Sequence, residues 1–149
     1  MSPPSREQLL KTAKIFLQGF NEFTPEAVTR LGSPNCTYRM GPECLKQAPK
    51  SNDEIKTFVK ALQTITPTFE LKLVEGEEIM VDVEARKIAM HLRSHSPTVA
   101  GLYQNEYIFI VTLSEDGTMV DDVLEFTDSL HSAEMLPKMA KAAEEAAKK

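Results

Sequence analysis

Several acid–base side chains of this 149-residue chain lie beside apolar strand patterns, where they could do chemistry. Asp128 ends one such pattern, and a carboxylate in a dry apolar cavity has a raised pKa that makes it a usable base near neutral pH. Arg39 can orient a substrate carboxylate or carbonyl with its forked donors, and Tyr38 or Tyr107 can donate to an enolate oxygen. Each has an ordinary alternative: Asp128 as a helix N-cap, Arg39 on an exposed rim and the tyrosines in packing.

The register of one predicted hairpin determines which side chains accompany these groups. The turn at 114–117 (SEDG) pairs Leu113 with Thr118. Because opposed residues share a face, this register gives an apolar face that ends in Asp128. The predicted substrate-binding set is Asn105, Tyr107, Phe109, Phe126, Phe58 and Leu62. Its phenylalanines and Leu62 are expected to belong mainly to the core and secondarily to the pocket wall.

The same register predicts a polar network on the other face of the hairpin. Glu106 lies directly opposite Glu125, and two like charges in this arrangement destabilise a sheet unless they are neutralised. Arg93 on the preceding strand can neutralise both carboxylates, with His91 on the same face. Two interpretations stay open: a salt-bridge lattice on the outer or dimer-facing side, or a catalytic acid–base group brought into the cavity by a one-residue register shift between 94 and 102.

The sequence contains no motif for a metal or a cofactor. His91 and His95 share a strand face, but no third ligand stands at a suitable spacing, so no metal site is expected. No P-loop, dinucleotide fingerprint or nucleophile elbow occurs, so no cofactor is expected. Cys36 and Cys44 form no CxxC pair and are interpreted as reduced thiols.

The elements that must position these residues come in the order helices, then strands. Capping residues at Ser5, Thr24 and Ser51 predict three helices. The segment 132–149 is expected to form a fourth helix, which either is kinked at Pro137 or begins there. A period of two predicts strands at 68–75, 78–83, 87–96, 103–113 and 119–129, after a short extended piece at 35–40. This order indicates an α+β fold in which helices cover one face of a curved antiparallel or mixed sheet.

Length and charge restrict the class of protein. The chain fits one domain, 1–149, with 1–4 and about 140–149 at its periphery. The net charge of −5 and the lack of a Lys/Arg stripe argue against nucleic acid or an anionic membrane as a partner. The opening residues hold no apolar signal segment, so a cytoplasmic protein is expected.

Six segments, in this order, resemble the small fungal SnoaL-like proteins of the nuclear transport factor 2-like superfamily. They are 35–42 (NCTYRMGP), 51–54 (SNDE), 82–91 (DVEARKIAMH), 105–107 (NEY), 116–117 (DG) and 125–129 (EFTDS). The similar proteins include isomerase and cyclase enzymes of fungal meroterpenoid and polyketide pathways. The resemblance implies a cone-shaped sheet, a homodimer and cofactor-independent acid–base chemistry on a hydrophobic secondary-metabolite intermediate.

Carried over to the matching positions, the family pattern points to Tyr38, Arg39, His91 and Asp128 as the catalytic set. The chain departs from this pattern at Tyr38, where relatives often have histidine. It also has Phe109 where the ketosteroid isomerases have an acid, so steroid-isomerase chemistry is disfavoured. The alternative function is a non-catalytic module that uses the same cone to bind a small molecule or to form an interacting dimer.

Overall fold

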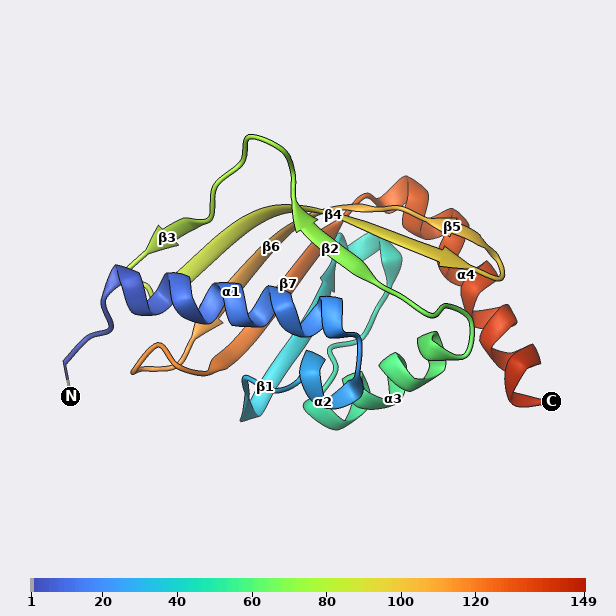
Figure 1. The fold of residues 1–149 in the computed structure, drawn as a ribbon, viewed down its shortest axis with the longest axis horizontal. Coiled ribbons are helices and arrows are strands. Elements are labelled where there is room, and N and C mark those ends of the chain that lie inside the picture. Colours follow the sequence, from blue (N-terminus) through green and yellow to red (C-terminus); the bar gives the residue numbers. More distant parts are fainter. Residues whose placement is uncertain (1) are drawn as a thin grey trace.

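The computed structural model describes residues 2–149, in which helices flank a seven-stranded sheet (Figure 1). The helices are α1 (Arg6–Glu22), α2 (Pro25–Val28), the 3-10 turn η1 (Glu43–Leu45), α3 (Asn52–Gln63) and α4 (Ser129–Ala147). The strands are β1 (Gly32–Gly41), β2 (Glu70–Leu73), β3 (Met80–Asp82), β4 (Lys87–Thr98), β5 (Gly101–Tyr103), β6 (Glu106–Leu113) and β7 (Val120–Thr127). No helix within residues 2–149 combines the length and the apolar character that a membrane crossing needs.

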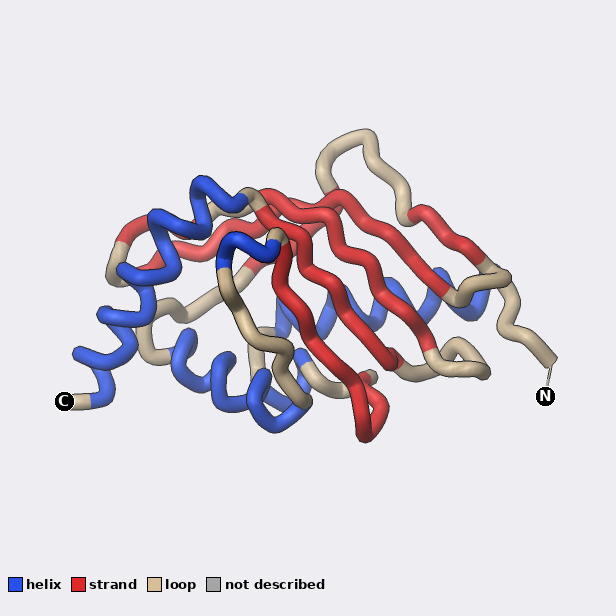
Figure 2. Tube along the Cα trace, turned by 180° about the vertical axis from the view of Figure 1, so that it is seen from behind, coloured by secondary structure: helices blue, strands red, loops and turns tan. Residues whose placement is uncertain are grey.

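The strands form one curved mixed sheet in the order β1-β7-β6-β4-β2, and β3 and β5 each pair with β4. The β1–β7 pair is parallel, and the other pairs are antiparallel. Figure 1 shows α1 crossing one face of the sheet, with α2 and α3 beyond it, and Figure 2 shows the opposite face with the strands in front of α1. The predicted α+β class with helices over one face of a curved sheet is confirmed.

Local caps explain where the helices on this face begin. The Ser5 side chain caps α1, and Ser51 with Glu54 makes both hydrogen bonds of a capping box at the start of α3. The apolar stripe of α1 then lies on the sheet, where Phe16 meets Phe109 of β6 edge-on with ring centroids 6.2 Å apart. The apolar stripe of α1 is therefore part of the core of the domain.

The register of the β6–β7 hairpin differs from the predicted one by three residues, because Tyr107 lies opposite Thr127 instead of Leu124. Two of the three come from a longer turn. Ser114 N donates to Met119 O at 2.9 Å, so the strands close two residues later than the predicted turn allows. This part of the shift is even and leaves the facing of the side chains unchanged.

The third residue of the register shift comes from a β-bulge at Asp121. This residue pairs with no residue of β6, although its neighbours Val120 and Asp122 are both paired. Beyond the bulge, Thr112 lies opposite Asp122. An odd shift exchanges the two faces of β7 relative to β6. As a result Glu125 joins the helix-covered face and Phe126 leaves it, so the predicted face assignment of both residues is wrong.

The end of the sheet also differs from the prediction. The predicted strand 103–113 is divided into β5 and β6, and the predicted strand 119–129 ends at Thr127. The C-terminal helix begins at Ser129, three residues before the predicted start, because Asp128 already caps it. Pro137 lies inside the helix, so the interpretation that the helix begins there is wrong.

Candidate functional site

A pocket of about 120 Å³ lies on the helix-covered side of the sheet, between β1, β6, β7 and the helices α3 and α4. Its wall is mostly apolar and includes Phe20, Phe23, Phe58, Leu62, Phe69 and Phe109. Polar side chains reach it from the strands and from the loop before α3: Tyr38, Lys50, Tyr103, Tyr107 and Glu125. An apolar cavity with a few polar groups is typical of small-molecule sites.

Glu125 is the acid of this pocket. It lies opposite Phe109 in the hairpin and is a diagonal neighbour of Tyr107 on the same face. Glu125 is half-buried, and the partial loss of water around it raises its pKa from 4.5 to about 7, although the positive charge of Lys50 opposes this change. A carboxyl with a pKa near neutrality can take a proton when ionised and return it when protonated.

Two tyrosines stand beside this carboxyl, and Tyr103 and Tyr107 are only 5% and 2% exposed. Burial raises the pKa of both hydroxyls, and the negative charge of Glu125 contributes in the same direction. Tyr107 Oη donates to Tyr103 Oη at 3.3 Å and lies 2.9 Å from Ser94 Oγ. Both phenols therefore stay protonated at neutral pH and can act as hydrogen-bond donors.

Tyr38 and Lys50 form the edge of the pocket. Their backbones exchange two hydrogen bonds of 2.9 and 2.8 Å, which tie the loop before α3 to β1. Tyr38 lines the pocket wall as expected, but its hydroxyl already donates to Asn52 Oδ1 at 3.0 Å. Lys50 Nζ lies 5.9 Å from the centroid of the Phe58 ring, so a cation stands beside the aromatic wall.

Arg39 contributes to the rim of the pocket, and its guanidinium pairs with Asp122. Nε donates to Asp122 Oδ1 at 2.9 Å and Nη2 donates to Oδ2 at 2.7 Å. Thr37 Oγ1 donates to the same carboxylate at 2.5 Å. The guanidinium donors that we expected to orient a substrate are thus bound to a carboxylate of β7. This agrees with the alternative interpretation, in which Arg39 lies on the exposed rim.

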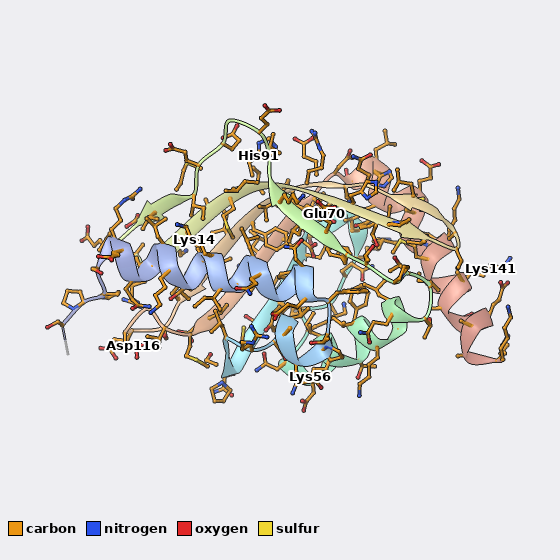
Figure 3. The ribbon with its side chains drawn as sticks, in the orientation of Figure 1. Lys14, Lys56, Glu70, His91, Asp116 and Lys141 are labelled. Atoms are coloured by element: carbon orange, nitrogen blue, oxygen red, sulfur yellow. The ribbon has the colours of Figure 1, made fainter. Side chains whose placement is uncertain are left out.

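His91, Arg93 and Glu106 form an ion-pair lattice on the outer face of the sheet. His91 Nε2 lies 2.6 Å from Glu106 Oε2, and Arg93 Nη2 lies 3.5 Å from Glu106 Oε1. His91 Nδ1 is also 3.5 Å from Glu77 Oε1, and Figure 3 shows His91 beside the segment between β2 and β3 that carries Glu77. The interpretation of these residues as a salt-bridge lattice is therefore right. The alternative prediction, which placed His91 in the cavity, is wrong. Glu125, which was predicted to join this network, is not a member of it.

Asp128, Asn105 and Phe126 lie outside the pocket wall, which corrects their predicted positions. Asp128 is exposed, and its Oδ1 accepts hydrogen bonds of 3.0 and 3.3 Å from two backbone N–H groups in the first turn of α4. Phe126 is 49% exposed on the outer face, and Asn105 is buried behind Tyr103. The other predicted lining residues do line the pocket, and they are Tyr107, Phe109, Phe58 and Leu62.

The sequence reasoning did not single out Tyr103 or Lys50 and placed Glu125 on the wrong face. A signal for Glu125 exists in the doublet Asp121-Asp122, which interrupts the apolar alternation of the strand and marks the bulge. Lys50 has no such signal, because only the loop conformation places it there. Among residues 2–149, no three His, Cys, Asp or Glu side chains are grouped in a way that could hold a metal ion.

Comparisons relate this chain to proteins of fungal biosynthesis clusters. No family model matches the sequence. The "Austinoid biosynthesis cluster protein H" of Aspergillus calidoustus is 36% identical over 128 residues, which cover 85% of this chain and 87% of that protein. The structure of BvnE pinacolase from Penicillium brevicompactum has a TM-score of 0.87 at 38% identity and covers 91% of this chain and 93% of that one.

A more distant structure extends the comparison of the fold. A SnoaL-like protein from Shewanella denitrificans has a TM-score of 0.71 at 8% identity, and the match covers 89% of this chain and 98% of that one. Identity this low carries information about the fold alone. It confirms the SnoaL-like fold that the six sequence segments indicate, and the austinoid cluster protein H confirms the resemblance to proteins of fungal secondary metabolism.

Proposed function

The chain belongs to the family of the austinoid biosynthesis cluster protein H and has a SnoaL-like fold, and from this premise we propose that it is an isomerase or cyclase of secondary metabolism. Its substrate is a hydrophobic intermediate of the meroterpenoid or polyketide type, bound in the apolar pocket. One observation carries the proposal: Glu125, with a pKa of about 7, lines this pocket together with two protonated tyrosines.

The proposed reaction begins with the ionised Glu125 carboxylate, which removes a proton from a carbon next to a carbonyl group. The electrons of the broken C–H bond move to the carbonyl oxygen, and a tyrosine hydroxyl stabilises the resulting enolate with a hydrogen bond. Where a carbon–carbon double bond adjoins the deprotonated carbon, the enolate extends over it; Glu125 then returns the proton to the far carbon of that bond, the carbonyl re-forms, and the shifted double bond completes an isomerisation. In a cyclisation the enolate carbon instead attacks a second carbonyl of the same molecule, whose oxygen takes the proton from Glu125.

The surroundings of Glu125 suit both halves of this reaction. A pKa near 7 leaves comparable amounts of base and acid at neutral pH, and a positioned acid–base group contributes about 10²–10⁴-fold to a rate. The wall around Glu125 is mostly apolar, and a hydrogen bond to the enolate is stronger in a site with little water. The proton that is removed is also the proton that is returned, so the proposed steps use no cofactor.

A non-catalytic binding module is the second candidate, and the many aromatic residues of the pocket wall favour it. A carrier of apolar ligands gains nothing from a half-buried acid among those residues, because removing a carboxylate from water costs free energy. The polar set around Glu125 therefore favours the enzyme. The homodimer implied by the resemblance stays part of the proposal, and light scattering of the purified protein tests it.

The catalytic proposal is tested by incubating the purified protein with candidate pathway intermediates that carry an enolisable carbonyl. An isomerase or cyclase of this kind gives a product of unchanged mass and altered chromatographic retention. We expect Glu125→Gln to lower the rate by about 10²–10⁴-fold, while Asp128→Asn, which keeps the helix cap, retains the wild-type rate. Equal rates for Glu125→Gln and wild type would exclude Glu125 as the base, and tight binding without any product would favour the binding module.

A further inference from the structure

A chain of buried polar groups lies behind the pocket and joins the strands to α4. Asn105 is 2% exposed and Ser132 of α4 is fully buried. Asn105 Nδ2 lies 2.9 Å from Tyr103 Oη and 2.9 Å from Ser132 Oγ. Asn105 also binds through its backbone, since its N–H donates to Ser94 Oγ at 3.1 Å. One amide therefore contacts both the tyrosine that lines the pocket and the helix behind it.

The orientation of this amide follows from a neighbouring peptide group. Glu106 N lies 2.9 Å from Asn105 Oδ1, and a peptide N–H can only donate. The oxygen of the Asn105 side chain must therefore face Glu106. Its NH₂ group must face Tyr103 and Ser132, to which it donates both of its protons.

The Tyr103 hydroxyl consequently accepts two hydrogen bonds. One comes from Asn105 Nδ2 at 2.9 Å and the other from Tyr107 Oη at 3.3 Å. A phenol oxygen that accepts twice still carries its own proton. No hydrogen bond among residues 2–149 has Tyr103 Oη as its donor, and the Tyr103 side chain lines the pocket. The Ser132 hydroxyl also lies close enough to lower the pKa of Tyr103, but it already accepts the second proton of the Asn105 amide.

Aromatic contacts hold the Tyr103 ring in place. His131 of α4 stacks on it with ring centroids 5.5 Å apart and an interplanar angle of 28°. Phe69 lies near the same ring at 6.4 Å and 33°. Since the ring is fixed and the oxygen accepts from Asn105 and Tyr107, the hydroxyl proton is available to an acceptor that enters the pocket.

We propose that Asn105 is a positioning residue: by donating to Tyr103 Oη it directs the Tyr103 proton to a carbonyl oxygen of the bound molecule. The ligand class is therefore a hydrophobic ketone or a related carbonyl compound. This inference rests on the proposed function for its catalytic meaning, because the same hydrogen bond would stabilise the enolate. Asn105 itself touches no ligand and acts through Tyr103.

Acetophenone, a small aromatic ketone, serves as the probe because its binding needs no turnover. The carbonyl stretch of the bound ketone is measured by infrared difference spectroscopy at pH 8, where Glu125 is ionised and cannot donate to the carbonyl. We expect a stretch at lower frequency in the wild-type protein than in an apolar solvent. A wild-type protein that binds no acetophenone, or binds it with the frequency seen in apolar solvent, overturns the proposal.

The variants separate positioning from a structural role. Asn105→Asp replaces a donor by an acceptor, so the Tyr103 proton turns to the carboxylate and away from the ketone. We expect Asn105→Asp and Tyr103→Phe to lose the frequency shift and to weaken acetophenone binding by about 3–10-fold, the usual value of one hydrogen bond. Asp128→Asn is the control, because Asp128 is an exposed residue of the α4 cap outside this network, and the variant should keep the shift.

A double variant completes the test. Asn105→Asp should add nothing to the loss in a Tyr103→Phe background, whereas a general structural effect would weaken binding again. Where circular dichroism shows that Asn105→Asp is unfolded, Asn105→Ala replaces it, and an intermediate shift is expected because water can accept the Tyr103 proton. A wild-type shift in the folded Asn105 variants overturns the proposal.

The two proposals fail separately in these measurements. A shifted carbonyl without turnover of any pathway intermediate rejects the isomerase or cyclase and retains the role of Asn105. Turnover that depends on Glu125, together with an unshifted ketone, rejects the role of Asn105 and retains the enzyme.

Discussion

Replacing Glu125 by glutamine is expected to stabilise the protein at alkaline pH while it removes the proposed base. Burial raises the pKa of Glu125 to about 7 in the folded protein, whereas the unfolded chain has the ordinary value of 4.5. Between these two values the native state holds a proton that the unfolded chain has lost. The stability associated with neutral Glu125 is therefore full below about pH 4.5 and is lost as the pH rises through 7.

The magnitude follows from the two pKa values. Each pH unit between them is worth about 1.4 kcal/mol, so ionisation of Glu125 costs the folded protein about 3 kcal/mol in total. About 2–3 kcal/mol of this loss falls between pH 5 and pH 8. Glutamine has nearly the same shape and stays neutral, so the free energy of unfolding of Glu125→Gln, relative to wild type, should rise by this amount over the same range.

Urea unfolding followed by circular dichroism at pH 5, 6, 7 and 8 measures this difference. Glu106→Gln is the matched control, because Glu106 is a strand glutamate on the outer face whose pKa is lowered by its hydrogen bond with His91. Its replacement should give no gain in stability at pH 8. A difference between Glu125→Gln and wild type that stays constant with pH would refute the reasoning, since it would mean that water solvates Glu125 as it does a surface carboxylate.

Three further predictions concern the neighbouring charges and the corrected residues. Lys50→Met should raise the pKa of Glu125 above 7, because the positive charge of Lys50 lowers it. The acidic limb of the pH–rate profile, where the base loses its proton, then moves to higher pH, and an unmoved limb contradicts this effect of the Lys50 charge. Asp128→Ala should lower the free energy of unfolding by about 0.5–2 kcal/mol through loss of the helix cap, with turnover unchanged; urea unfolding and the product assay check it, and a lost rate in the folded variant contradicts it. In NMR titration the His91 ring should titrate above 6.5, because its hydrogen bond with Glu106 raises its pKa, and Glu106→Gln should bring the value down.

Local features of the fold were predictable, because the interactions that create them span a few residues. The caps at Ser5 and Ser51 act over three residues along the chain, and the structure has helices at both places. The period of two after residue 68 predicts strands because alternation depends only on neighbouring side chains. The pocket positions of Phe58 and Leu62 followed from the stripe of their own helix.

The register of β6 and β7 was not predictable by the same reasoning. It depends on how the turn closes at Met119 and on one unpaired residue, Asp121, and both are settled by packing on the two faces at once. A single extra residue changes the face of every side chain after it. This is why Asp128 was predicted to be the pocket acid, although Glu125 holds that position.

The sequence by itself determined that two glutamates, Glu106 and Glu125, stand on neighbouring strands among apolar residues. Its six segments also indicated the SnoaL-like fold. Only the tertiary structure decided that Glu106 meets His91 on the outer face, whereas Glu125 lies in the pocket beside Tyr103. The physical reason is that the proton affinity of a carboxyl depends on the water and the charges around it. Those surroundings are set by contacts between residues far apart in the chain.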